Sequence, residues 1–128
     1  METICIDTDI IIDYLKGNAY KNILPSVLNK YLCKVTPVTV YELYYGGFYT
    51  GKIKPVEDVL ACLTPIIWTE KASKESAKIH VELIKKGFSL DIRDIFIASI
   101  CCTEKIPLLT RNVKHFKHIK ELKLVSPE

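Results

Sequence analysis

The sequence predicts an α/β fold in which a parallel sheet of four to five strands lies between two layers of helices. Short apolar runs rich in β-branched residues alternate along the chain with stretches whose apolar residues recur at helical spacing. This alternation favours a parallel sheet, because right-handed crossovers place the connecting helices on its faces. A length of 128 residues and an apolar content of 48% suit one core, so we expect a single domain over residues 1–128.

The first two strand-helix units follow from apolar runs and helical spacing. Residues 3–7 (TICID) are apolar and β-branched up to a terminal carboxylate, which predicts a buried strand. Residues 10–16 have apolar positions at helical spacing, and the Gly17-Asn18 pair after them favours the end of a helix. A second amphipathic helix is predicted over residues 20–31, and a second strand over residues 33–38.

A third helix is predicted to begin at Thr39. Thr39 and Glu42 match a capping box, in which a threonine and a glutamate three residues later satisfy each other's end of the first helical turn. The helix should reach Gly46 or beyond, and the Gly46-Gly47 pair and Gly51 should loosen or break it.

The second half of the chain continues the alternation of strands and helices. Residues 56–63 predict a short helix, residues 65–69 a third strand, and residues 72–86 an amphipathic helix. Asp91 is placed to cap a further apolar helix over residues 92–103. The remaining predicted elements are a strand at residues 107–110, a short helix at residues 113–118 and a fifth strand at residues 122–125.

Acidic and amide side chains lie at the predicted strand ends and helix starts. Asp7 closes the first strand, and Glu42 lies in the first turn after the second. Asp91 and Asp94 flank the start of the helix before the fourth strand, and Asn112 follows that strand. Ligands of open parallel sheets bind beyond the carboxyl ends of the strands. The sequence therefore predicts one polar pocket built from four separate segments.

Each acid at a helix start also has a purely structural interpretation. Glu42 completes the capping box, Asp91 is a helix N-cap, and Asp94 suits the helix dipole. Taken singly, capping is favoured over catalysis by about two to one, because acids near helix starts usually cap. Asp7 is harder to explain in this way, since it ends a buried strand and a buried carboxylate is costly unless it is paired or bound to a metal.

Convergence of these acids would create a site for a divalent cation. Carboxylates held close together raise each other's pKa or require a cation. A ligand set made only of oxygens suits a hard ion such as Mg²⁺ or Mn²⁺. Such a site activates a water molecule and neutralises the charge that develops on a phosphodiester, so metal-assisted phosphodiester hydrolysis is the predicted chemistry.

Four segments resemble the motifs of PIN-domain toxins from toxin-antitoxin pairs, of the virulence-associated protein C (VapC) type. They occur in family order and span residues 4–119. The segments are Ile6 to Gly17, which includes Asp7-Thr8-Asp9; Thr39-Val-Tyr-Glu42-Leu43, followed by Gly46; Asp94-Ile-Phe-Ile-Ala-Ser-Ile100; and Leu108-Leu-Thr-Arg-Asn112, followed by Phe116.

The resemblance implies a fold, a site and a function. The chain would form one three-layer PIN domain, and Asp7, Glu42 and Asp94 would be the catalytic and metal-binding acids. The supporting residues would be Thr8, Asp91 and Asn112. The protein would be an endoribonuclease that uses Mg²⁺ or Mn²⁺ to cut RNA, and it would be the toxin partner of a cognate antitoxin protein.

One residue departs from the family pattern. The family often has an Asp three residues after the Asn of the last motif, and this chain has His115 there. A histidine can bind a metal or a phosphate, but in a Lys-rich segment a solvated surface histidine is favoured by roughly three to one. Asp91 would partly compensate, or the metal would be held more weakly. We interpret Asp9 as a helix N-cap and Asp13 as a support for the ligands or a surface residue.

The segment from Lys105 to Lys123 is strongly basic. It contains six Lys and Arg residues and two His residues against one acid, Glu121. Binding of a phosphate backbone and a solvated helix face explain this composition about equally well. The net charge of +3 is too small to indicate nucleic-acid binding by itself. The candidate RNA contacts are Arg111, Lys114 and His115.

Five aromatic residues lie close together in the helix predicted after Thr39: Tyr41, Tyr44, Tyr45, Phe48 and Tyr49. They could stack on bases, but exposed aromatic residues on a helix more often mark a protein interface. We therefore expect them to contact an antitoxin or a second copy of the chain, and we expect a homodimer.

The cysteines and the lack of a long apolar run indicate the compartment. The five cysteines lack the spacing of a zinc site, so we expect them to be reduced core residues. No stretch approaches the roughly 20 apolar residues of a membrane helix, and we find no signal peptide. We expect a soluble, cytoplasmic protein without a membrane partner.

Two other functions remain open. The Asp7-Thr8-Asp9 triplet after an apolar strand also resembles the nucleophile motif of haloacid-dehalogenase-type phosphatases, although Ile11 stands where those enzymes have Thr or Val and their late acidic pair is missing. Alternatively, a PIN-like fold with a weakened metal site, given His115, would only bind RNA or a partner protein.

Overall fold

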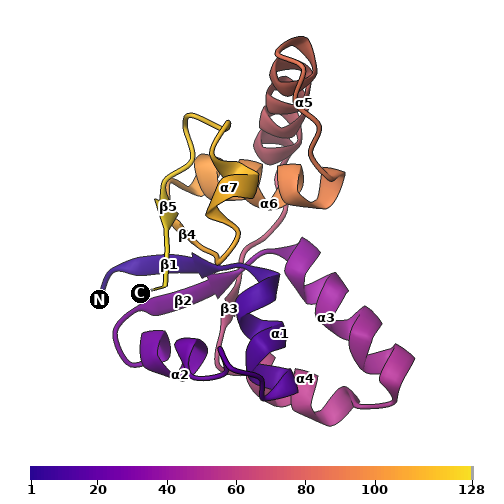
Figure 1. The fold of residues 1–128 in the computed structure, drawn as a ribbon, viewed down its shortest axis with the longest axis vertical. Helices are drawn as coiled ribbons and strands as arrows, with labels where there is room; N and C mark the ends of the chain where they lie inside the picture. Colours follow the sequence, from indigo (N-terminus) through magenta and orange to yellow (C-terminus); the bar gives the residue numbers. More distant parts are fainter. Residues whose placement is uncertain (128) are drawn as a thin grey trace.

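Five parallel strands form the central sheet of the computed structural model, which describes residues 1–127 (Figure 1). The spatial order of the strands is β3-β2-β1-β4-β5, and all four neighbouring pairs are parallel. The strands are β1 (Thr3–Ile6), β2 (Leu32–Val35), β3 (Thr64–Pro65), β4 (Leu108–Leu109) and β5 (Leu124–Val125). The predicted parallel sheet is confirmed, while Glu128, the last residue of the predicted domain, lies outside the described residues.

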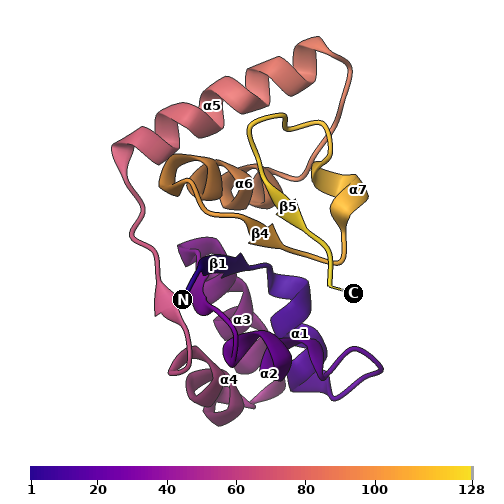
Figure 2. The ribbon, with the colours of Figure 1, turned by 90° about the vertical axis from the view of Figure 1, so that its left-hand side faces the viewer.

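Helices cover both faces of this sheet. Those within residues 1–127 are α1 (Thr8–Lys16), α2 (Ile23–Leu28), α3 (Pro37–Thr50), α4 (Ile53–Leu60), α5 (Glu70–Lys85), α6 (Ile92–Glu104) and α7 (Val113–Phe116). Figures 1 and 2 show α1 to α4 on one side of the sheet and α5 to α7 on the other, which confirms the predicted three layers. Across the described part of the chain, no helix has the length and apolar character needed to span a membrane.

The side chains of the strands alternate between two apolar cores, one on each face of the sheet. Ile4 and Ile6 of β1 pack with residues of α1 to α4, whereas Cys5 between them packs with residues of α5 and α6. Leu108 and Leu109 of β4 divide in the same way. Because both faces are buried, the strands are continuous apolar runs, which is the pattern that made them recognisable in the sequence.

The path of the chain across the sheet changes direction between β1 and β4. From β1 the chain moves outward through β2 to β3, and α5 and α6 then carry it over the opposite face to β4, on the other side of β1. Cys5 pairs with Leu108, and Ile6 pairs with Leu109. Asp7 and Thr110 therefore leave the sheet side by side, at the point where open parallel sheets bind their ligands.

The start of α3 differs from the prediction. Thr36 is the N-cap, and its hydroxyl accepts a hydrogen bond from the Thr39 backbone N–H at 3.2 Å. Pro37 fits the first turn because its φ is fixed and because it lacks the N–H that a helix start leaves unpaired. The capping box predicted from Thr39 and Glu42 is therefore wrong, and β2 ends earlier than predicted, at Val35.

The glycines within α3 do not interrupt the helix. It passes through Gly46 and Gly47 and ends at Gly51, which has a left-handed φ of 78°. A Cβ at Gly47 would lie 3.0 Å from Ile53 Cδ1 and 3.1 Å from Val56 Cγ2, whereas a Cβ at Gly46 would meet nothing within 4 Å. Gly47 therefore allows α3 and α4 to approach closely.

Several predicted elements are shorter than expected. β4 covers Leu108–Leu109 rather than residues 107–110, β5 covers Leu124–Val125 rather than residues 122–125, and α7 covers Val113–Phe116 rather than residues 113–118. α2 covers Ile23–Leu28 rather than residues 20–31, because turns occupy residues 19–22. β3 has two residues: after the Ile66 N–H donates to the Val35 carbonyl at 2.8 Å, the chain leaves the sheet.

The cysteines are free thiols, as predicted. Cys5, Cys33 and Cys101 are buried, and Cys102 is partly buried against the core. Cys62 is exposed, so its assignment to the core is wrong.

The Gly47→Ala substitution should destabilise the protein, because the added methyl group would lie within 3.1 Å of the Ile53 and Val56 side chains. Overpacking of this kind costs about 1–3 kcal/mol in the free energy of unfolding. Gly46→Ala is a matched control in the same helix and should raise this free energy by about 0.5–1 kcal/mol through helix propensity. Urea denaturation measures both changes, and equal changes for the two variants would contradict the close packing.

Candidate functional site

Asp7 follows β1 at the switch point of the sheet, which is the place between β1 and β4 where the path of the chain changes direction. Only 5% of its surface is exposed. It is the N-cap of α1, and one carboxylate oxygen accepts a hydrogen bond from the Thr8 backbone N–H at 2.8 Å. The other oxygen accepts a hydrogen bond from the Thr110 hydroxyl at 2.7 Å. Burial, reinforced by the charges of Asp9 and Asp94, raises the pKa of Asp7 to about 7.

Glu42 approaches the same edge of the sheet from α3. Its Oε1 accepts a hydrogen bond from the Thr8 hydroxyl at 2.7 Å, and that hydroxyl also lies 2.8 Å from the hydroxyl of Thr39. Its Oε2 lies 3.4 Å from the guanidinium of Arg93. Glu42 therefore points toward α1 and α6, and not back toward the start of its own helix as capping would require.

Asp94 lies in the first turn of α6 and is partly buried. Burial raises its pKa, the charge of His115 opposes this increase, and the charges of Asp91 and Glu42 add to it. His115 Nδ1 lies 3.3 Å from Asp94 Oδ2, although 56% of the histidine side chain is exposed. The prediction of a histidine that is only solvated is therefore wrong, because the imidazole contacts one of the candidate acids.

Asp91 is the N-cap of α6, as predicted. Its Oδ1 accepts a hydrogen bond from the Arg93 backbone N–H at 2.8 Å, and its Oδ2 pairs with the Arg93 guanidinium at 2.9 Å. The hydrogen bonds from Arg93 lower the pKa of Asp91 to about 2. The Arg93 guanidinium also lies near Glu42. Asp91 therefore holds the positive charge of Arg93 beside the candidate acids.

Asp9 of α1 differs from its predicted role, and one of the two alternatives predicted for Asp13 is wrong. Asp9 is not the N-cap, because Asp7 has that position; its Oδ2 accepts a hydrogen bond from the Arg111 backbone N–H at 3.1 Å. Asp13 is not a surface residue, because only 4% of it is exposed, and it forms two hydrogen bonds with the Arg111 guanidinium, at 2.7 and 3.2 Å. These hydrogen bonds, together with one from Asn18, hold the pKa of Asp13 below its usual value even though burial acts to raise it.

The segment after β4 supplies the remaining predicted residues. The Asn112 backbone N–H donates to the Thr110 hydroxyl oxygen at 3.0 Å, while the Asn112 side chain makes no capping bond to α7. Lys114 is exposed on α7.

Thr110 and Arg93 were not identified from the sequence. Thr110 could have been predicted, because it ends the predicted strand at residues 107–110 as Asp7 ends the predicted strand at residues 3–7. Arg93, between Asp91 and Asp94 at a helix start, offered a weaker signal because an exposed arginine in that place is common.

The three candidate acids lie at one edge of the sheet. The charges of Asp7 and Asp94 interact, as do those of Asp94 and Glu42, and Thr8 bonds to both Asp7 and Glu42. The raised pKa values of Asp7 and Asp94 suit a hard cation, which would relieve the repulsion between these carboxylates. Within residues 1–127, no group of three or more His, Cys, Asp or Glu side chains is arranged to hold a metal ion. Mg²⁺ commonly binds one or two carboxylates and several waters, so the donor set fits such an ion.

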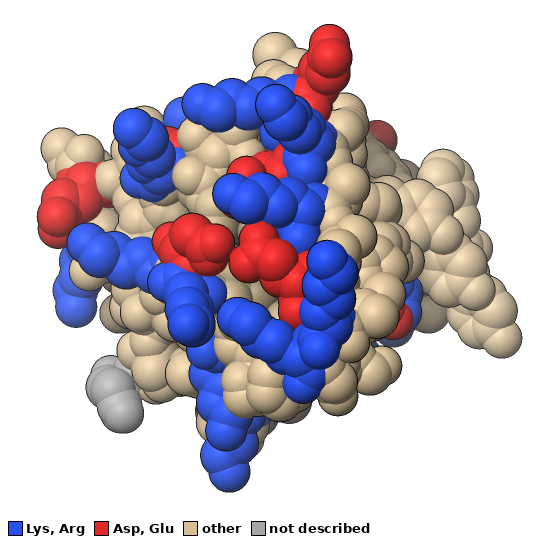
Figure 3. All heavy atoms as spheres, turned by 90° about the horizontal axis from the view of Figure 1, so that it is seen from above, with Lys and Arg blue, Asp and Glu red and all other residues tan. Residues whose placement is uncertain are grey.

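Basic side chains are not confined to the segment from Lys105 to Lys123. All six Lys and Arg residues of that segment are exposed. The face seen from above α5 also carries Lys and Arg, with acidic side chains among them (Figure 3). The distribution is therefore broader than the sequence segment alone indicated.

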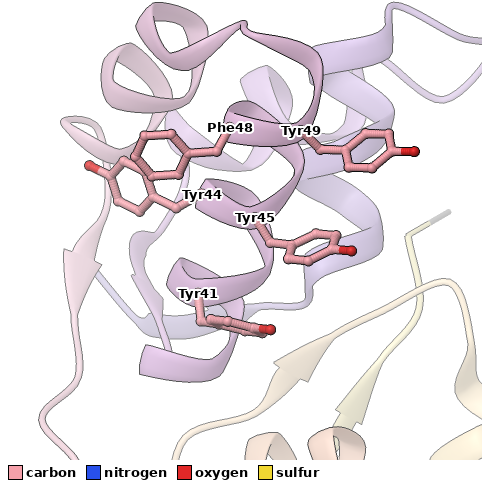
Figure 4. A pocket seen from close by; sticks show the side chains of 5 residues that line it. All are labelled: Tyr41, Tyr44, Tyr45, Phe48 and Tyr49. Atoms are coloured by element: carbon pink, nitrogen blue, oxygen red, sulfur yellow. The ribbon is translucent and has the colours of Figure 1, made fainter.

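The five aromatic residues of α3 lie at the surface: four are exposed, and Tyr44 is partly buried against the core. Figure 4 shows Tyr41, Tyr45 and Tyr49 in a row along one side of the helix, with Tyr44 and Phe48 on the other side. The rings of Tyr45 and Tyr49 are 6.3 Å apart and nearly parallel, and those of Tyr44 and Phe48 are 6.1 Å apart. Tyr49 is 82% exposed and Phe48 is 72% exposed. We call these five residues the aromatic surface.

Residues 4–122 match the sequence pattern of the PIN domain family. The chain is 34% identical over 95 residues to Ribonuclease VapC3 of Methanocaldococcus jannaschii, covering 74% of this chain and 94% of that protein. It is 29% identical over 122 residues to Ribonuclease VapC2 of Haemophilus influenzae, covering 92% of each. These matches give no support to the phosphatase alternative.

Solved structures share the fold. VapBC2 from Rickettsia felis, bound to a DNA fragment from its promoter, includes a chain with a TM-score of 0.86 and 24% identity, covering 98% of this chain and 99% of that one. VapBC-1 from nontypeable Haemophilus influenzae includes a chain with a TM-score of 0.83 and 27% identity, covering 97% of each.

The free energy of unfolding should fall as pH rises from about 4 to 7. The pKa of Asp7 is about 7 in the folded protein and 3.8 in its ordinary state, so the folded protein binds a proton that the unfolded chain releases. This contribution is complete below pH ~4 and is lost as pH rises through about 7. Asp7→Asn, which cannot ionise, should remove about 1–4 kcal/mol of the decline.

Urea denaturation of the metal-free protein between pH 4 and 8 measures this effect. Asp58→Asn is the control, because Asp58 is an exposed carboxylate paired with Lys54. The control should keep the wild-type slope, and a slope for Asp7→Asn equal to that of the wild type would refute the raised pKa.

Proposed function

The chain belongs to the PIN domain family, and from this premise we propose that it is a metal-dependent endoribonuclease with Asp7, Glu42 and Asp94 as its active-site acids. Within the family it is a ribonuclease of the VapC type, the toxin component of toxin-antitoxin systems. The observation that carries the assignment of the site is Asp7, a buried carboxylate with a raised pKa at the switch point of the sheet. Perturbed acids in such a place are typical of catalytic sites.

In the proposed site, Asp7, Glu42 and Asp94 would hold Mg²⁺ or Mn²⁺. When bound, the ion supplies an activated water and neutralises charge that develops on the phosphodiester. The residues of the chain orient the acids: Thr8 donates to Glu42, and Thr110 donates to Asp7. These bonds fix each carboxylate before a ligand arrives, which favours catalysis by preorganisation.

His115 contributes to the same site by its contact with Asp94. The imidazole occupies one side of this carboxylate and limits its rotation. Together with the exposed Lys114 on α7, it also places positive or hydrogen-bonding groups where an RNA phosphate would approach the acids. We propose that the RNA backbone passes over this end of α7.

We propose that the aromatic surface binds a protein, either the cognate antitoxin or a second copy of the chain in a homodimer. α3 carries no basic residue, whereas RNA-binding surfaces need cations near the stacked bases. The pocket on α3 is lined only by its own aromatic side chains. Exposed aromatic residues on a helix without Lys or Arg are typical of protein interfaces.

Asp7→Asn and Asp94→Asn should each lower the rate of RNA cleavage in Mn²⁺ by about 100-fold or more, because each removes a charge that holds the ion. Binding of RNA, measured by fluorescence anisotropy, should change little. Asp58→Asn is the control, because Asp58 is an exposed carboxylate of α4 that pairs with Lys54, and this variant should cleave at the wild-type rate. A wild-type protein that binds RNA but cleaves none with Mn²⁺ would favour the binding-module alternative.

Replacing Tyr45 and Tyr49 together with Glu should abolish association with the antitoxin or with a second copy, because two charges would be buried in the interface. Light scattering measures the mass of the protein alone and mixed with the antitoxin. Tyr14→Glu, at an exposed tyrosine of α1, is the control. RNA cleavage should be retained in both variants, and unchanged masses for the double variant would refute this surface as the interface.

A further inference from the structure

A salt bridge outside the group of candidate acids ties the loop after β4 to α1. Asp13 is almost completely buried on α1, and both of its oxygens bind the Arg111 guanidinium, at 2.7 Å from Nε and at 3.2 Å from a terminal nitrogen. Asn18 donates a further hydrogen bond to Asp13 at 2.8 Å. The guanidinium carbon lies 3.9 Å from the centre of the Tyr20 ring. Two-point pairing and a stacked ring fix the orientation of Arg111.

The backbone around Arg111 is attached to the same helix. The Arg111 N–H donates to Asp9 Oδ2 at 3.1 Å. The residue before it, Thr110, donates its hydroxyl to Asp7 at 2.7 Å, and the residue after it, Asn112, donates its N–H to that hydroxyl oxygen at 3.0 Å. The positions of residues 110–112 thus depend on hydrogen bonds to Asp7, to α1 and to one another.

The sheet ladder ends where this loop begins. β4 has only two residues, and the Thr110 N–H makes the last ladder contact, to the Val125 carbonyl at 3.2 Å. Beyond it, the direction of the Thr110 hydroxyl depends on how the loop is anchored. The guanidinium of Arg111 is already committed to Asp13 and Tyr20, and only 33% of the side chain is exposed. The Nε and one terminal nitrogen of Arg111 already donate to Asp13, so a contact of these same groups with an RNA phosphate would break the pair and leave the buried Asp13 charge without its cation.

We infer that Arg111 and Asp13 are positioning residues that hold the Thr110 hydroxyl against Asp7, and that Arg111 does not bind RNA. The inference rests on the proposed function, because it assigns Asp7 to the active site. It replaces the interpretation of Arg111 as an RNA contact that the basic segment suggested. The pair acts through Thr110, so its removal should affect turnover and not affinity for RNA.

The test compares Arg111→Met and Asp13→Asn with the wild type in RNA cleavage and RNA binding. We expect kcat to fall about 10-fold in both variants, as for other residues that orient a ligand of an active site, with the Kd for RNA unchanged. In a Thr110→Val background, Arg111→Met should cause no further loss, because both changes remove the same contact. Lys120→Met, which removes one exposed charge from the same segment, is the control and should keep the wild-type kcat.

Two results would overturn the inference. A weaker Kd with a salt dependence reduced by about one ion would show that Arg111 binds a phosphate. An unchanged kcat in both variants would show that the pair has no influence on the site. If Arg111→Met does not fold, Arg111→Lys carries the same test, because it keeps the charge and loses the two-point pairing.

Hydrogen exchange tests the inference without catalysis. The amides of Arg111 and Asn112, which donate to Asp9 and to the Thr110 hydroxyl, should exchange faster in Asp13→Asn than in the wild type. Unchanged exchange would overturn the positioning role even in a protein that cuts no RNA. A wild type without ribonuclease activity, but with faster exchange in the variant, would refute the proposed function and leave the anchoring role standing.

Discussion

The arrangement of the site depends on one buried carboxylate, that of Asp7, held at the end of β1. A charge in this place is unfavourable unless hydrogen bonds or a cation compensate for the lost water. One oxygen of Asp7 accepts a hydrogen bond from the Thr8 backbone N–H, which follows β1. The other accepts a hydrogen bond from the hydroxyl of Thr110, which the parallel register of β1 and β4 places beside it. The other candidate acids then gather around this group, because helices that follow or precede neighbouring strands begin at the same edge of the sheet.

Two arginines separate the acids into electrostatically different groups. Arg111 neutralises Asp13, and Arg93 neutralises Asp91, and the pKa of each of these partners is lowered. The pKa values of Asp7 and Asp94, whose oxygens form no salt bridge with arginine in the described part of the chain, are raised. The same residue type is therefore held in two electrostatic states, because an arginine lowers the pKa of Asp13 and Asp91 while burial raises the pKa of Asp7 and Asp94. Such divergence of pKa values among neighbouring acids is how sites assign different roles to identical side chains.

Much of this fold was predictable from the sequence because a sheet buried on both faces leaves uninterrupted apolar runs. The convergence of residues 7, 42 and 94 was predictable for a related reason, since strand ends of one sheet meet. The start of α3 was predicted wrongly because two helix-start patterns lie close together. Thr36 followed by Pro37 begins the helix instead of Thr39, and Glu42 is therefore free to accept a hydrogen bond from Thr8. The pairing of Asp13 with Arg111 was not predictable, because the two residues are 98 positions apart and no local pattern links them.

The threonines between α1 and α3 form a line of hydroxyl groups with a fixed polarity. A carboxylate only accepts hydrogen bonds, so the single proton of the Thr8 hydroxyl is used on Glu42. Thr39 must then donate to Thr8, and Thr36 to Thr39. Each hydroxyl serves as a donor to one neighbour and an acceptor from the other. Replacing Thr39, the middle residue, with valine would leave the Thr36 hydroxyl without an acceptor and the Thr8 oxygen without a donor, so the buried contact between α1 and α3 tolerates only side chains that both donate and accept at this position.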